Sequence, residues 1–197
     1  MSPAMAADPG WYGGLGIGYS KVKIDDATLT VPGATAFTRS KDESDTGFKF
    51  FGGYQFNQNW GLELGYVDLG KFNAQVNVTA PVVGSATANI KASGIFLDLV
   101  GTAPLQNNFS VYGKLGAIYA ETKTDRTFSG AVVLPAGQVA NAKHTETAFK
   151  FGLGAQYDFT KTVGLRGEWE RYYKLGDSNS TGEGDVDLFS INLVFRF

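Results

Sequence analysis

The chain has 197 residues with no cysteine and one histidine, and its 17 basic and 19 acidic side chains nearly cancel. This inventory excludes a disulfide framework, Cys/His zinc sites and Cys-His catalysis, and the balanced charge gives no reason to expect a nucleic-acid partner. The length suits one domain. No apolar run approaches the ~18 residues that a membrane helix needs, which excludes helical insertion.

A short segment precedes the first patterned stretch. Residues 4–8 read Ala-Met-Ala-Ala-Asp, which resembles the small-residue end of a secretory signal. We expect residues 1–9 to be a leader, either a signal-peptide remnant or a vector-derived segment.

In chain order, eight segments then carry large apolar residues at every second position, which is the period of a β-strand. They cover residues 11–20, 48–56, 60–67, 95–103, 109–119, 149–159, 163–173 and 189–197. In the first segment, Trp11, Leu15 and Ile17 share one face, and glycines at 14, 16 and 18 share the other. The pattern predicts eight strands with one apolar face each.

The connections between these segments alternate in length. Short connections lie around 57–59, 104–108 and 160–162, and long ones lie around 24–45, 70–92, 122–146 and 174–186. Membrane β-barrels have short turns at one end and long loops at the other. The alternation therefore favours an antiparallel up-and-down barrel.

The second face of the strands decides which side meets water. Its charged residues balance five against five among many glycines: Lys49, Lys114, Lys150, Arg166 and Arg196 beside Glu63, Asp98, Asp158, Glu168 and Glu170. A narrow lumen needs small residues and paired charges, whereas a water-facing surface needs neither. We place this face inside, so residues 10–197 are expected to form an all-β, eight-stranded transmembrane barrel. A soluble ligand-binding barrel, with the apolar face inside, is the alternative.

Aromatic residues near the strand ends suit the membrane interface, where amphipathic rings are enriched. The main interface candidates are Trp11, Trp60, Tyr66, Tyr157 and Trp169, with Tyr19 and Tyr119 as further members.

Several of these segments resemble the transmembrane domain of the outer membrane protein A (OmpA) family. The matching stretches are Gly52-Gly53-Tyr54-Gln55-Phe56-Asn57, Gly61-Leu62-Glu63-Leu64-Gly65-Tyr66 followed by Asp68-Leu69-Gly70, Tyr112-Gly113-Lys114-Leu115-Gly116, and 191–197. The resemblance implies a multi-pass protein of a Gram-negative outer membrane, with short turns toward the periplasm and four long extracellular loops. It also implies lipid and lipopolysaccharide as neighbours. The barrel-assembly machinery is an expected partner through the last strand, with Phe197 as the assembly signal.

The resemblance further implies a lumen crossed by ion pairs. Family members hold a lumenal glutamate against an arginine, and Glu63 and Arg166 occupy the matching positions; a second family pair falls at Gln156 and Val100 and is not reproduced. The candidates for lumen ion pairs or a gate are Glu63, Arg166, Lys114, Glu168, Asp98 and Lys150. A static bridge and a gate for small ions both remain open.

Catalysis has little support, because the single histidine, His144, lies in a predicted long loop without a suitable serine nearby. Residues 177–185 superficially resemble the start of a calcium loop, but Leu188 stands where a bidentate glutamate is needed. We expect no enzyme, cofactor or metal.

The expected function is a structural outer-membrane barrel whose loops are available for surface recognition or adhesion. A narrow, gated channel for ions or small solutes is the main rival.

Overall fold

The computed structural model of the chain describes residues 9–22, 35–81, 83–132, 140–177 and 182–197. Within these ranges every regular element is a strand, and no helix is long and apolar enough to cross a bilayer. The strands are β1 (Gly10–Val22), β2 (Ala36–Asp42), β3 (Ser44–Gln55), β4 (Trp60–Ala80), β5 (Gly84–Pro104), β6 (Phe109–Gly130), β7 (Asn141–Asp158), β8 (Val163–Asp177) and β9 (Gly182–Arg196). Residues 1–8 of the expected leader, and 23–34, 133–139 and 178–181 of the predicted loops, lie outside the described ranges.

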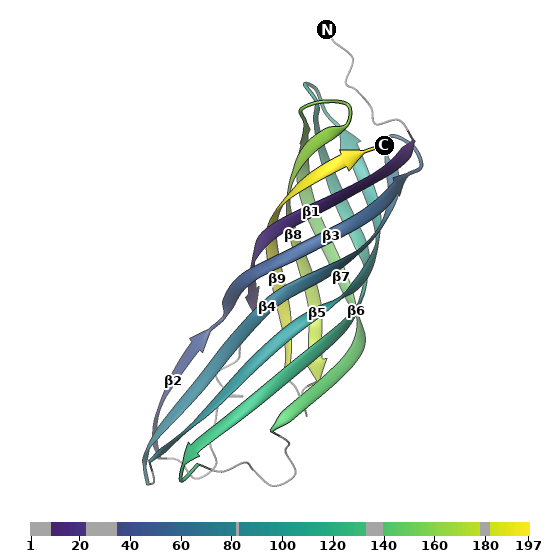
Figure 1. Ribbon diagram of the computed structural model, residues 1–197. Coiled ribbons are helices and arrows are strands. Elements are labelled where there is room, and N and C mark those ends of the chain that lie inside the picture. Colours follow the sequence, from purple (N-terminus) through teal and green to yellow (C-terminus); the bar gives the residue numbers. More distant parts are fainter. Residues whose placement is uncertain (1–8, 23–34, 82, 133–139, 178–181) are drawn as a thin grey trace.

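The strands close into one antiparallel ring (Figure 1). The order is β2-β4-β3-β1-β9-β8-β7-β6-β5, and the pairing of β4 with β5 completes the ring. β2 pairs with β4 along residues 73–80, beyond the stretch 61–68 that β3 occupies, so β2 and β3 share one position. The nine strands in the described part of the chain thus fill eight positions, which confirms the predicted eight-stranded barrel.

Three tight connections lie at one end of the barrel, which we call the turn end. Residues 56–59, 105–108 and 159–162 join successive strands there, and β1 begins and β9 finishes at the same end (Figure 1). The Asn57 Oδ1 atom accepts hydrogen bonds from the backbone N–H groups of Asn59 and Trp60, both at 2.9 Å. Side-chain acceptors of this kind satisfy backbone donors that a tight reversal leaves unpaired. The predicted short connections are confirmed.

The opposite end, which we call the hairpin end, differs from the prediction. Residues 70–92 and 122–146 were expected to be long loops. In the structure, however, β4 continues to Ala80, β5 begins at Gly84, and β6 continues to Gly130. Cross-strand pairing satisfies the backbone whether or not the side chains alternate in polarity, so these stretches extend the barrel wall. Figure 1 shows β2, β4, β5 and β6 reaching furthest from the turn end.

Two irregularities change which residues face inward along a strand. The pairing of β4 with β5 shifts between Asp68 and Lys71, where Gly70 has a φ of 84°, and the pairing of β8 with β9 shifts between Tyr172 and Leu175. An extra residue at a bulge inverts the alternation beyond it. Leu69 is buried before the first bulge and Phe72 after it, so the inward positions in β4 change from odd to even numbers.

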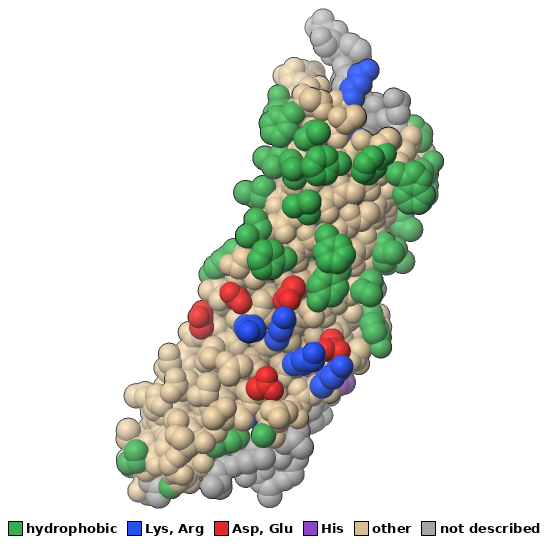
Figure 2. Space-filling view, viewed as in Figure 1, with side chains coloured by type: hydrophobic (Ala, Val, Ile, Leu, Met, Phe, Trp, Pro, Cys, Tyr) green, Lys and Arg blue, Asp and Glu red, His purple; other side chains and the backbone are tan. Residues whose placement is uncertain are grey.

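The two faces of the wall differ as the prediction requires. Large apolar residues point outward and are exposed, such as Leu15 (59%), Leu64 (56%) and Leu153 (58%), and they form an apolar band on the outer surface (Figure 2). Charged residues such as Lys49, Glu63 and Lys150 are buried inside. A soluble barrel would need the reverse arrangement, so that alternative is not favoured.

Candidate functional site

The lumen contains a continuous chain of alternating charges. Starting near the turn end, Arg166 Nη1 lies 2.7 Å from Glu63 Oε2, whose other oxygen lies 2.5 Å from Lys114 Nζ. Lys114 continues to Glu168 at 2.9 Å, and Glu168 also pairs with Lys49.

The chain then turns toward the hairpin end. Lys49 Nζ lies 2.7 Å from Glu170, Glu170 lies 2.6 Å from Lys150 Nζ, and Lys150 lies 2.7 Å from Asp98. All eight side chains are at most 7% exposed, and four cations face four carboxylates. A buried charge is tolerated only when it is paired and hydrogen-bonded, and this network meets that condition for each member.

Each glutamate of the network also accepts a hydrogen bond from a buried tyrosine. The hydroxyl of Tyr12 donates to Glu63 at 3.3 Å, that of Tyr112 to Glu168 at 2.7 Å and that of Tyr172 to Glu170 at 3.2 Å. Aromatic rings flank the cations as well, with Lys150 Nζ 4.0 Å from the centre of the Phe96 ring. The tyrosines satisfy carboxylate lone pairs that the ion pairs leave free, and this fixes the rotamers of the network.

Glycines on the inner face make room for these large side chains. A Cβ atom at Gly154 would lie 2.3 Å from the Tyr112 hydroxyl, and one at Gly116 would lie 2.2 Å from Asp98 Oδ1. At Gly53 the same atom would lie 2.4 Å from the Tyr12 ring. The alternation of glycine with aromatic and charged residues is therefore a packing requirement of a narrow lumen.

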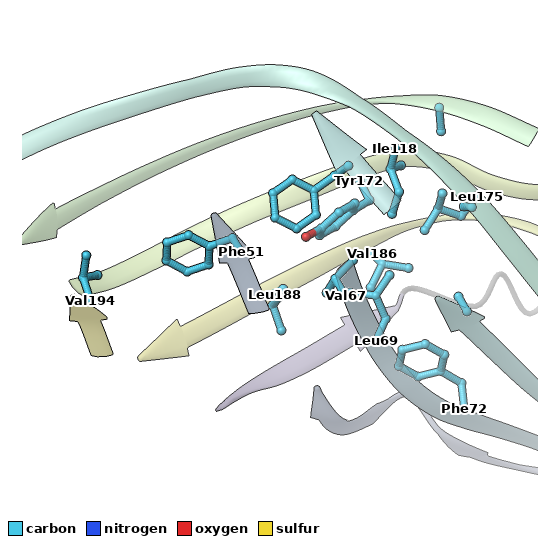
Figure 3. Packing of buried hydrophobic residues seen from close by; sticks show 14 of the residues in the cluster. Phe51, Val67, Leu69, Phe72, Ile118, Tyr172, Leu175, Val186, Leu188 and Val194 are labelled. Atoms are coloured by element: carbon cyan, nitrogen blue, oxygen red, sulfur yellow. The ribbon is translucent and has the colours of Figure 1, made fainter. Parts of the chain in front are cut away.

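Toward the hairpin end, an apolar plug replaces the ion network. Its members come from six strands and are buried together: Val67, Leu69, Phe72, Ala92, Ile118, Ala120, Ala148, Leu175, Val186 and Leu188. Figure 3 shows Ile118, Val186 and Leu188 converging with Tyr172 beside Val67. Ile118 and Val67 are completely inaccessible to solvent, so the lumen is closed by hydrocarbon on this side of the ions.

Toward the turn end, the lumen opens into a cavity of about 40 Å³. Its lining includes Arg166, Gln156, Asp158 and Arg196, and Arg196 lies 2.7 Å from Asp158. A space of that size holds about three water molecules. Water therefore has room as far as the Arg166 side of the network.

Most of the sequence-derived candidates meet in this lumen. Glu63, Arg166, Lys114, Glu168, Asp98 and Lys150 all belong to the chain of charges. At the two positions where the family's second pair is not reproduced, Gln156 accepts a hydrogen bond from Arg166 Nε at 3.1 Å, and Val100 is buried. The site candidates did not include Lys49, Glu170 or the three tyrosines. Their positions on the inward face of the alternating pattern could have identified them.

Other candidates lie elsewhere. His144 is a correction: it belongs to β7 rather than to a loop, and its Nε2 atom lies 3.9 Å from Glu146 Oε2. Trp11 (66%) and Trp60 (51%) are exposed on the outer face at the turn end. Trp169 donates to Asp187 at 3.0 Å, and Tyr66 stacks on Phe50. Part of the calcium-like stretch, 178–181, lies outside the described residues.

The family model of the OmpA-like transmembrane domain matches residues 6–197. The chain belongs to this family. Outer membrane protein A of Yersinia pseudotuberculosis is 28% identical over 200 residues, which cover 100% of this chain and 51% of that protein. The chain thus spans about half the length of the curated relatives it matches.

Solved structures share the fold of this OmpA-type barrel. Neisserial surface protein A aligns with a TM-score of 0.56 at 14% identity and covers 95% of this chain and 97% of that one. OprG from Pseudomonas aeruginosa aligns with a TM-score of 0.53 at 20% identity and covers 95% and 96%. The protein is an OmpA-type barrel of the bacterial outer membrane.

Proposed function

We propose that this domain is a closed structural barrel without enzymatic activity, which anchors its hairpin end above the membrane as a surface for recognition or adhesion. The observation that carries the proposal is the double obstruction of the lumen. An ion must displace the charge network and then cross a plug that includes Val67, Ile118 and Leu188.

The two obstructions differ in kind. Arg166 could swing away from Glu63 into the cavity at the turn end, but this movement would leave the apolar plug in place. An apolar constriction excludes ions because it offers no groups to replace their hydration shell. A static role for Glu63, Arg166 and their neighbours is therefore favoured over a gate.

The extended hairpins support the proposed surface role. β2 and the ends of β4, β5 and β6 form a second apolar cluster of their own, which contains Val76, Val78 and Val132. Because this cluster is separate from the plug, it lets this part of the wall hold its shape away from lipid.

Three partners follow from an outer-membrane location. Lipid and lipopolysaccharide would surround the apolar band, with Trp11, Trp60, Tyr66, Tyr157 and Trp169 at its interfaces. The barrel-assembly machinery would recognise the C-terminal strand β9, which presents Phe189 and Ile191 outward, together with the exposed Phe197 that follows it.

Conductance across a planar lipid bilayer tests the proposal. The wild-type protein and Glu63→Ala should both stay at the background level, because the apolar plug is intact in both. Glu121→Ala, which removes a carboxylate from the outer surface, is the matched control and should behave identically. Stepwise single-channel currents from the wild type, or their appearance only in Glu63→Ala, would establish a channel instead.

A further inference from the structure

Four lysines lie side by side across the outer surface at the hairpin end. Lys71 of β4 is directly opposite Lys91 of β5, Lys91 is opposite Lys123 of β6, and Lys123 is opposite Lys143 of β7. Adjacent strands lie ~4.8 Å apart, so this lysine row spans ~14 Å with one ammonium group on each strand. Like charges directly opposite one another destabilise a sheet, and a row of four calls for a compensating anion.

The chain itself compensates the row only in part. Asp68 lies 3.0 Å from Lys91, and Glu121 lies 2.7 Å from Lys123 and 2.5 Å from Lys143. Asp68 and Glu121 thus pair with three of the four ammonium groups. The Asp45 carboxylate accepts a hydrogen bond from the backbone N–H of Lys71, but among the described residues the Lys71 ammonium group has no ion-pair partner.

The distance of the lysine row from the edge of the apolar band indicates which ligand it meets. Tyr66, Ile95 and Tyr119 are mutual register partners at the edge of the apolar band, and the row lies four residues beyond Ile95 and Tyr119 along their strands. Four residues correspond to ~13 Å along a tilted strand, which is the level of lipid headgroups. Figure 2 shows charged side chains gathered directly below the apolar band on the visible face.

The side chains also have the required access. The exposed fractions are 44% for Lys91, 55% for Lys123 and 58% for Lys143, and Lys71 is exposed. Each ammonium group has three donors, and the strands hold neighbouring groups at a spacing that one tetrahedral oxyanion can bridge.

We propose that the row formed by Lys71, Lys91, Lys123 and Lys143 is a binding site for the phosphate groups of an outer-leaflet glycolipid. The wall width of four strands accommodates two phosphates, one between each pair of lysines. The site rests on the proposed placement of the hairpin end outside the cell among lipopolysaccharide. It is independent of whether the lumen conducts.

The test measures binding of fluorescent lipopolysaccharide to the protein refolded in neutral detergent micelles. Lys123→Gln with Lys143→Gln should weaken binding about 25-fold, since each lysine near an anionic surface contributes about fivefold. Changing the same two residues to Arg should keep the affinity within about threefold, because arginine also binds phosphate. Lys161→Gln, at the turn end, is the matched control and should bind as the wild type does.

Two further arms identify the source of the phosphate. Lipopolysaccharide stripped of its phosphates should bind the wild type as weakly as the native lipid binds the double Gln variant, and millimolar pyrophosphate should compete poorly. Equal binding of the stripped lipid, or no loss in the double Gln variant, would overturn the proposal. Saturation by pyrophosphate at the affinity of the lipid would assign the site to free phosphate and would also overturn it. The conductance experiment reads the lumen alone, so either proposal can fail without the other.

Discussion

Several glycines of the inner face are packed so tightly that no larger side chain fits at their positions. Gly116 lies against Asp98, and a Cβ atom there would lie 2.1 Å from the Leu97 carbonyl oxygen, which is backbone and cannot rotate away. Gly167 in β8 faces outward and has nothing within 4 Å of the corresponding position. Two glycines of the same wall thus have opposite tolerance for a methyl group.

We therefore expect Gly116→Ala to lower the free energy of unfolding by about 1–3 kcal/mol, the usual range for overpacking. Gly167→Ala should change it little or raise it slightly, because alanine restricts the unfolded chain. Urea unfolding in lipid vesicles, followed by tryptophan fluorescence, measures both. Equal midpoints for the two variants would contradict the packing role of the inner glycines.

Glu63 touches more of the charge network than a simple pair would. It bridges Arg166 and Lys114 and accepts from Tyr12, so Glu63→Gln keeps the shape but leaves two buried cations facing an amide. Breaking a buried pair from one side costs about 3–5 kcal/mol. Glu121→Gln removes a charge from an exposed pair and should leave stability nearly unchanged. The same urea titration compares them, and a loss as small in Glu63→Gln as in Glu121→Gln would mean that solvent screens the lumen.

At the scale of the strand, alternation predicted the eight positions and the inner face but not the strand ends. The period-two pattern is strong from Trp60 to Val67 because Leu62, Leu64 and Tyr66 alternate with Gly61, Glu63 and Gly65. At Gly70 the bulge inverts the parity, so Phe72 and Ala74 are buried at even positions and the pattern read from the sequence stops.

Beyond the apolar band the contrast between faces also fades. Thr122 and Thr124 face inward and Thr127 faces outward in β6, so polarity no longer distinguishes the two sides. Lys71, Lys91, Lys123 and Lys143 lie in stretches that the sequence assigns to loops, and only the register aligns them. The ion-pair partners within the lumen could not be predicted from the sequence either. Which inward residues meet across the lumen depends on the register shift between strands in the closed barrel, and alternation does not reveal that shift.

The same element-scale reasoning gives a test of the lipid-facing surface. Leu64 is 56% exposed on the outer face in the middle of the apolar band, so Leu64→Arg should destabilise the barrel by about 2–4 kcal/mol. Thr127→Arg, on the outer face of β6 past the lysine row, should be nearly neutral. Unfolding in lipid vesicles and folding yield report both, and comparable tolerance at the two positions would refute the assignment of the apolar band to lipid.

On the scale of the whole molecule, the two ends of the barrel lie in different compartments. The chain has no cysteine, so a single introduced thiol is a unique label. Ser129→Cys, at the hairpin end, should react on intact cells with a polymer maleimide of about 5 kDa, because a reagent of that size does not cross the bilayer. Lys161→Cys, at the turn end, should react only after the outer membrane is permeabilised. Labelling of Lys161→Cys alone in intact cells would invert the orientation.

The charge network has a consequence for how the ring closes. β8 supplies Arg166, Glu168 and Glu170 at successive inward positions, and their partners stand on β3, β4, β6 and β7. If β8 closed two residues out of step, Glu168 would stand where Arg166 belongs and would confront the carboxylate of Glu63. Backbone pairing alone is indifferent to such a slip, since every N–H still finds a C=O. The buried charges therefore select the register of closure. A shifted register places like charges together and is destabilised by repulsion, whereas the native register pairs opposite charges.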